Sequence, residues 1–229
     1  MPRKTRRTSN TEPPQQQEII IRTVKPKNEE QTNLIKVIHR NQLIFLTGLS
    51  GCGKSYVSAG LASEYLERNL IERVIISRPV VGSEYQFGTL PGEIADKLMP
   101  YLNPLIQELS YFINVKKYIA EEKIVILPVS FMRGYTFRDS FVLVDECSNL
   151  TYNQLKMILT RLGENTKMIL NGDTEQSDLS NTNKRDFFRV IEKLKPVINN
   201  PDNKVAHVEL KQSVRHPLIK TLLNHLEES

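Results

Sequence analysis

Cysteine, clustered histidine and long hydrophobic runs are scarce in this sequence, and each absence excludes a class of protein. The 229 residues include two cysteines without C-x-x-C spacing, so we expect a reducing compartment and neither a disulfide framework nor a zinc site. The four histidines are scattered and predict no metal cluster. No run approaches the ~18 consecutive apolar residues of a membrane span, and no apolar signal core is found near the start. We therefore expect no membrane partner and a location in the cytoplasm, or the host cytoplasm if a virus encodes the protein.

The net charge of +5 is unevenly distributed along the chain. Residues 1–17 hold four basic residues against one acidic residue, which is three of the five net charges, and they are rich in proline and glutamine. Such a segment cannot bury enough apolar surface to fold, so we expect a disordered basic tail over 1–17. The tail either adds non-specific contact with nucleic acid or only solubilises the terminus. We expect 18–229 to form one domain, with a hydrophobic content of 39% that is typical of a soluble globular protein.

Apolar, β-branched runs alternate with helical patterns after the tail. Strands are predicted at 43–47, 73–77, 123–129, 141–145, 167–171 and 205–210, and helices at 28–40, 55–68 and 151–162. Continuous apolar strands between helices predict an α/β fold, with a mostly parallel sheet covered by helices on both faces. A sheet of this kind binds its ligand beyond the carboxyl ends of its strands. Residues 88–113 contain prolines among apolar residues and predict an irregular helical insert, either a binding loop or a packing cover.

The run from Gly48 to Ser55 fits the phosphate-loop spacing G-x-x-x-x-G-K-[ST] and directly follows the buried strand at 43–47. Glycines allow backbone N–H groups to surround a polyphosphate, Lys54 is placed to reach the β- and γ-phosphates, and Ser55 to ligate Mg²⁺. The alternative is a glycine-rich turn that matches by chance. The sequence thus predicts a P-loop NTPase that binds ATP with Mg²⁺. The predicted nucleotide-binding residues in and beside the loop are Gly48, Ser50, Gly51, Cys52, Gly53, Lys54, Ser55 and Tyr56.

A second site is predicted where the strand at 141–145 ends in two carboxylates, Asp145 and Glu146. Phosphoryl chemistry needs one acid to hold the Mg²⁺ shell and another to orient attacking water. We assign the metal role to Asp145, together with Ser55, and the water role to Glu146. The Asp-Glu pair favours water as the nucleophile, and therefore hydrolysis over transfer of a phosphate to a metabolite. The alternative is a strand whose charges simply emerge at a solvated end.

Five further side chains are candidates on weaker grounds. Gln176 follows the strand at 167–171 and is predicted to sense the γ-phosphate or its water, and Arg215 to stabilise charge in the transition state. Gln31 is a candidate for reading the adenine edge. Arg78 and Arg133 follow strands at the ligand-facing edge and suit nucleic-acid phosphates, although both patterns are equally typical of solvated strand ends.

The chain resembles the PhoH-like family of P-loop ATPases, which is related to the superfamily 1 helicases. The resemblance extends from about Gln31 to Leu223 and includes the loop at 48–55, Ser77–Pro79, Phe131–Thr136, Val144–Glu146, Gly172–Asp173 and Val214–Leu218. It implies a RecA-like core, ATP and Mg²⁺ binding, a hexameric ring and a link to RNA. It also implies that Arg215 acts across subunits and that Gln176 couples hydrolysis to work.

One departure from the family pattern bears on function. The family usually follows its Asp-Glu pair with Ala-Gln, whereas Cys147 and Ser148 stand here. A glutamine that helps couple hydrolysis to nucleic acid is therefore missing. Two hypotheses follow: an oligomeric ATPase motor on single-stranded RNA or DNA, and a nucleotide-dependent assembly switch with slow turnover and no unwinding.

Overall fold

The computed structural model describes residues 22–79, 91–174, 181–198 and 200–219, together with Leu222 and His225. The predicted tail at 1–17 and the candidate Gln176 lie outside this part of the chain. The described strands form one sheet in the order β3-β2-β4-β5-β1-β6, and every neighbouring pair is parallel. Their bounds are β1 Leu43–Gly48, β2 Arg73–Ser77, β3 Ile124–Ile126, β4 Ser140–Val144, β5 Lys167–Asp173 and β6 Val205–Leu210.

The central strands are buried on both faces, as their continuous apolar runs predict. Along β1, Ile44 and Leu46 pack into one hydrophobic cluster while Leu43 and Phe45 pack into a second. Successive side chains of a strand point to opposite faces, so an uninterrupted apolar run supplies both cores. Burial of each large apolar side chain contributes about 1.5–3 kcal/mol relative to exposure.

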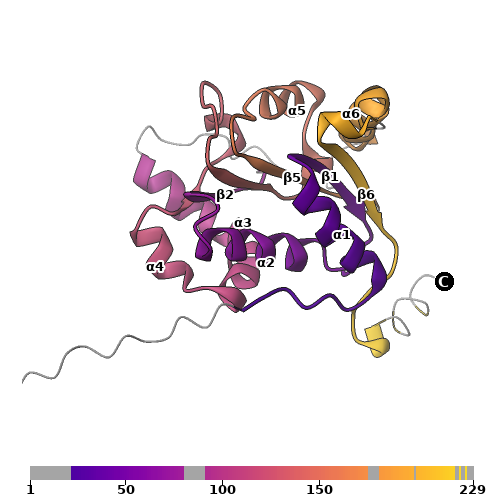
Figure 1. Cartoon of the computed structure of the whole chain (residues 1–229), viewed down its shortest axis with the longest axis horizontal. Coiled ribbons are helices and arrows are strands. Elements are labelled where there is room, and N and C mark those ends of the chain that lie inside the picture. Colours follow the sequence, from indigo (N-terminus) through magenta and orange to yellow (C-terminus); the bar gives the residue numbers. More distant parts are fainter. Residues whose placement is uncertain are drawn as a thin grey trace, which may run out of the picture.

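Helices cover the two faces of the sheet (Figure 1). One face carries α1 Glu29–Arg40, α2 Lys54–Glu67, α3 Pro91–Phe112 and α4 Val115–Ala120, and the other carries α5 Tyr152–Leu159 and α6 Asn181–Ile198. This confirms the predicted α/β class with helices on both faces. Within the described ranges, none of the helices is long and apolar enough to cross a bilayer.

Helix boundaries follow local signals in the sequence. Asn28 caps α1 by accepting from the N–H of Gln31, and α5 opens with the predicted capping box of Thr151 and Gln154. The α5 helix ends at Leu159, earlier than the predicted 162. The hydroxyl of Thr160 donates to the carbonyl of Met157 at 2.7 Å, a local bond that competes with continuation of the helix.

Two predicted segments differ from the structure. The strand expected at 123–129 is only β3, Ile124–Ile126, because Pro128 has no N–H for the ladder and a 3-10 helix, η1 Val129–Phe131, follows it. The insert expected to be irregular is α3, a helix of 22 residues that contains both Pro100 and Pro104. Leu105 and Leu109 of α3 pack into the core cluster that also holds α2, so tertiary packing outweighs the two prolines.

Candidate nucleotide-binding site

The phosphate loop begins where β1 reaches the carboxyl edge of the sheet. Gly51 and Gly53 have φ angles of 78° and 89°, in the left-handed region that favours glycine. A Cβ at Gly51 would collide with the side chain of Arg215, and one at Gly53 with the amide of Gln31, so both positions also need glycine for space. Gly53 is the N-cap of α2 and offers no side-chain cap. The first N–H groups of α2 are therefore suited to an anion, which the positive end of the helix dipole also favours.

Lys54 lies inside this loop. Its Nζ donates to the carbonyls of Gly48 at 2.6 Å and Leu49 at 3.0 Å, and lies 3.8 Å from Oδ2 of Asp173. Only 11% of its side chain is exposed. The ammonium group is thus placed where a polyphosphate would meet the loop.

Asp145 directly follows β4 and is held beside the end of β2, because its N–H donates to the carbonyl of Ser77 at 2.9 Å. Burial raises the pKa of Asp145, and the nearby Arg78 guanidinium opposes that rise. The amide of Asn171 on β5 donates to Oδ1 of Asp145 at 3.5 Å. The other amide atom, Oδ1 of Asn171, is buried with no hydrogen-bond partner among the described residues.

This arrangement of oxygens fits the Mg²⁺ that a P-loop fold implies. Ser55, Asp145 and Asn171 line one cavity, and hydroxyl, carboxylate and amide oxygens are ligands that Mg²⁺ or its bound waters accept. A buried acceptor without a donor costs free energy unless a water or ion completes it, and the Oδ1 atom of Asn171 is such an acceptor among the described residues.

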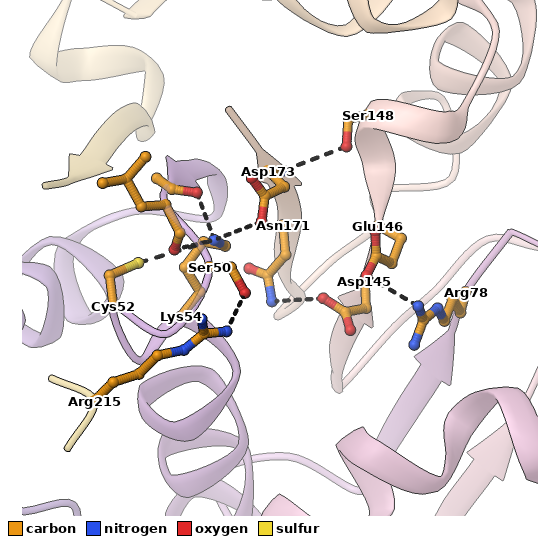
Figure 2. A network of polar contacts seen from close by, with 12 residues as sticks. Ser50, Cys52, Lys54, Arg78, Asp145, Glu146, Ser148, Asn171, Asp173 and Arg215 are labelled. Atoms are coloured by element: carbon orange, nitrogen blue, oxygen red, sulfur yellow. Dashed lines mark hydrogen bonds and ion pairs between the residues drawn. The ribbon is translucent and has the colours of Figure 1, made fainter. Parts of the chain in front are cut away.

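Glu146 takes up a strained backbone conformation at the same edge. Its φ of 55° and ψ of 37° lie in the left-handed region, which costs a non-glycine residue on the order of 1–3 kcal/mol and clusters at functional sites. Its Oε1 lies 2.9 Å from Nη2 of Arg78 (Figure 2). Arg78, expected as a nucleic-acid contact, therefore lines the nucleotide cavity and pairs with the predicted catalytic carboxylate.

Arg215 lies on the phosphate loop of its own chain (Figure 2). Its Nη2 donates to Oγ of Ser50 at 2.6 Å, and the preceding N–H, of Val214, donates to the carbonyl of Gly51 at 3.0 Å. The segment after β6 thus packs onto the loop of its own chain. The role of Arg215 across subunits that the resemblance implies stays a prediction.

The predicted residues meet around one cavity of about 440 Å³, within the size range of small-molecule sites. Arg133 is exposed after η1 and does not line this cavity. The predicted residues that do line it are Ser50, Gly51, Gly53, Lys54, Ser55, Tyr56, Arg78, Asp145, Glu146 and Arg215.

Gln31 contacts the loop from α1, and Cys52 is the loop residue that it contacts. Gln31 is fully buried, with Nε2 donating to the carbonyl of Cys52 at 3.0 Å and Oε1 accepting from the N–H of Lys27 at 2.9 Å. In this structure the glutamine supports the loop backbone, and its predicted contact with adenine stays a prediction. Cys52, also predicted to bind nucleotide, is buried and does not line the cavity, so that contact likewise stays a prediction.

Sequence reasoning did not assign Asn171, Asp173 or Ser148 to the site. Asn171 and Asp173 are the polar residues at the end of a buried strand that runs between β1 and β4, and this position is the signal that could have found them. The hydroxyl of Ser148 accepts a hydrogen bond from the N–H of Asp173 at 3.3 Å. This bond ties the turn after β4 to the end of β5, beside Lys54.

Comparison with known proteins decides the family. The family model described as PhoH-like protein matches residues 23–227. The chain belongs to the PhoH-like protein family. Protein PhoH of Escherichia coli K12 is 42% identical to this PhoH-like chain over 158 residues, which cover 67% of the chain and 45% of the relative. A PhoH-like protein of Synechocystis is 38% identical over 211 residues, covering 90% of the chain and 63% of the relative. The chain thus spans 45–63% of the length of these two relatives.

Solved structures agree on the fold. The large terminase from a thermophilic bacteriophage matches 88% of this PhoH-like chain and 50% of its own chain, with a TM-score of 0.55 at 11% sequence identity. At that identity the likeness shows the fold alone. Fold and family together fit a nucleotide-dependent ATPase of the P-loop class.

Proposed function

We propose that this protein hydrolyses ATP with Mg²⁺ and, as a homo-oligomer, uses the turnover to act on single-stranded nucleic acid, with RNA the expected strand. The observation that carries the ATPase proposal is the cavity at the carboxyl edge of the sheet. It is lined by Lys54 and Ser55 of the loop, by the carboxylates Asp145 and Glu146, and by Arg215. Segments from three separate parts of the chain supply a cation, two acids and an arginine to one place.

Each residue has a role that its position supports. The N–H groups at the start of α2 and the ammonium of Lys54 hold the β- and γ-phosphates. Ser55 and Asp145 hold Mg²⁺, with Asn171 beside them, and the bound ion would neutralise charge on the phosphate oxygens. Glu146 orients a water molecule and accepts its proton during attack on the γ-phosphorus. Arg215 stabilises the negative charge that spreads over the γ-phosphate oxygens.

The nucleic-acid proposal has a separate basis in the segment after η1. Phe131 is 44% exposed and Tyr135 is 52% exposed, and they flank the exposed Arg133. Exposed aromatic rings beside a guanidinium suit unstacked bases and a phosphate backbone. The hexameric ring rests on the family resemblance.

A second candidate function is the nucleotide-dependent assembly switch. It is favoured by Cys147 and Ser148, which stand where the family usually has Ala-Gln. The hydroxyl of Ser148 holds the end of β5, a structural role that supplies no coupling amide.

Steady-state ATP hydrolysis, with and without single-stranded RNA or DNA over a range of salt concentrations, separates the two functions. If the protein is a motor, single-stranded nucleic acid stimulates ATP turnover. Added salt then reduces this stimulation, because it screens the contacts between the protein and the phosphates of the strand. Slow turnover that neither strand changes would favour the switch. The mass of the assembly, measured with and without ATP, tests whether nucleotide sets the oligomeric state.

A further inference from the structure

Arg78 connects three parts of the fold at the edge of the nucleotide cavity. It directly follows β2, whose last residue, Ser77, lies opposite Val144, the last residue of β4. This register brings Arg78 close to the acidic pair after β4. One terminal nitrogen, Nη2, pairs with Glu146 at 2.9 Å, and the other, Nη1, donates to the carbonyl of Tyr101 in α3 at 3.1 Å.

The contact with α3 lies in the turn of that helix between Pro100 and Pro104. Pro104 has no N–H to offer the carbonyl of Pro100, and its ring crowds the preceding turn. The carbonyl of Tyr101 belongs to this same turn and accepts from Arg78. The guanidinium is therefore fixed on one side by α3 and on the other by the carboxylate, which limits its freedom to move away from Glu146.

The pair holds the carboxylate of Glu146 at the Arg78 side of the cavity. In Figure 2, Arg78 reaches Glu146 from the opposite side of Asp145 to Lys54 and Arg215. The carboxylate oxygen that pairs with Arg78 is engaged with the guanidinium and is not available to accept a proton from water at the γ-phosphate.

The same guanidinium is open to a competing anion. About a quarter of each side chain is exposed, 25% for Arg78 and 24% for Glu146, so solvent and solutes reach the pair. Arginine carries five N–H donors in a planar fork that matches a phosphate better than a single carboxylate oxygen. A polyanion with high local phosphate density is therefore a strong competitor for Arg78.

We propose that Arg78 is a positioning residue that restrains Glu146, and that a backbone phosphate of bound single-stranded nucleic acid takes over the guanidinium and releases the carboxylate for catalysis. This role rests on the proposed ATP hydrolysis and names how its nucleic-acid partner regulates it. Arg78 thereby supplies a coupling route at a site where the family glutamine is absent.

The first test measures basal ATP turnover of the full chain with the Arg78→Ala substitution. Release of Glu146 raises kcat by about three- to ten-fold while KM for ATP stays within about two-fold, since no phosphate contact is removed. Arg78→Lys keeps the charge and gives an intermediate kcat at the same KM, a result that a merely structural defect would not produce.

A matched control comes from the same strand. Arg73 is exposed at the amino end of β2, away from the cavity, and Arg73→Ala leaves both kcat and KM unchanged. A basal kcat of Arg78→Ala equal to or below that of the wild type, with a normal melting temperature, would overturn the restraint.

The second test adds oligouridylate or oligodeoxythymidylate to each variant. The wild type is stimulated, and the Arg78→Ala protein, already released, gives a ratio of stimulated to basal turnover near unity. An equal stimulation ratio in the two proteins, or a wild type that neither strand stimulates, would overturn release by nucleic acid.

Glu146→Gln distinguishes failure of this inference from failure of the proposed function. If Glu146→Gln abolishes turnover but Arg78→Ala behaves as the wild type, only the restraint is wrong. If Glu146→Gln keeps wild-type turnover, the assignment of Glu146 in the proposed function is itself wrong.

Discussion

Lys54 and Lys167 lie at opposite edges of the parallel sheet, and each directs its ammonium group at backbone carbonyls. Lys167 begins β5 at the amino edge, and its Nζ donates to the carbonyls of Ile38, His39 and Asn41 at 2.7, 3.1 and 2.8 Å. These carbonyls are at the end of α1, where the negative end of the helix dipole also favours a cation. Lys54 follows β1 at the carboxyl edge and donates to two loop carbonyls beside the carboxylate of Asp173.

The difference between the two lysines lies in what surrounds them. The three N–H donors of Lys167 meet three carbonyls that belong to one helix end, so the residue completes a cap. Lys54 lines a cavity together with two carboxylates, Asp145 and Glu146, and with arginines. Its hydrogen-bond partners are carbonyls of the loop that a phosphate would enter. Similar local chemistry thus serves stability at one edge of the sheet and ligand binding at the other.

The largest effect is expected from Lys54→Ala. Loss of the loop cation that reaches the phosphates lowers ATP turnover by at least about 100-fold. The melting temperature changes less than turnover does, because Lys54 lines a cavity that water can enter in place of its ammonium group. A coupled ATPase assay measures the turnover, and differential scanning fluorimetry measures the melting temperature. A variant that unfolds at a much lower temperature but keeps its turnover would contradict the contrast between Lys54 and Lys167.

Arg215→Ala is expected to lower turnover by about 10- to 100-fold, as removal of one transition-state donor commonly does. Since Arg215 contacts its own loop, subunits with Arg215→Ala mixed with subunits carrying Glu146→Gln regain no activity beyond the sum of the two. Restored turnover in the mixed assemblies would instead support the role across subunits that the sequence implied.

Lys167→Met is expected to act on stability and not on turnover. Removing the ammonium leaves three carbonyls at the end of α1 without their donor and lowers the free energy of unfolding by about 1.5–3 kcal/mol. Urea denaturation measures the loss, and kcat at a temperature well below the transition stays at the wild-type value. Equal stability of variant and wild type would remove the distinction between the two lysines.

A smaller, pH-dependent effect follows from the same residue. Burial lowers the pKa of Lys167 to about 8, from an ordinary value of 10.5. Between these values the unfolded chain binds more protons than the folded one, so this group makes the protein more stable as pH rises through that window. The difference in unfolding free energy between wild type and Lys167→Met therefore grows from pH 8 toward pH 10.5. A difference that shrinks over this range would contradict the lowered pKa.

The sheet and the core of the site were predictable because their signals are local. The spacing from Gly48 to Ser55, the apolar strand before it and the acidic end of β4 each lie within a few residues, and the structure brings them together. Continuous apolar runs were enough to indicate parallel strands buried on both faces. The predicted contacts with nucleotide and metal at these residues stay predictions.

Contacts between distant residues could not be predicted in the same way. The pair of Arg78 with Glu146 spans 68 residues, and Lys167 meets carbonyls 126–129 residues away, so neither leaves a pattern in the sequence. The insert was predicted to be helical but irregular, and its regular course through α3 was not predictable because packing on the core outweighs the local penalty of Pro100 and Pro104. The position of Arg215 depends on how the segment after β6 folds back over Gly51, which no local propensity encodes.

Nucleotide retention by the Glu146→Gln protein tests the central claim most directly. The variant is incubated with ATP and Mg²⁺, passed through a desalting column and analysed for bound nucleotide. The account predicts a stoichiometric amount of intact ATP, because the loop and Asp145 still hold the substrate while no carboxylate accepts the proton of water. Recovery of ADP formed at the wild-type rate, or of no nucleotide at all, would contradict it.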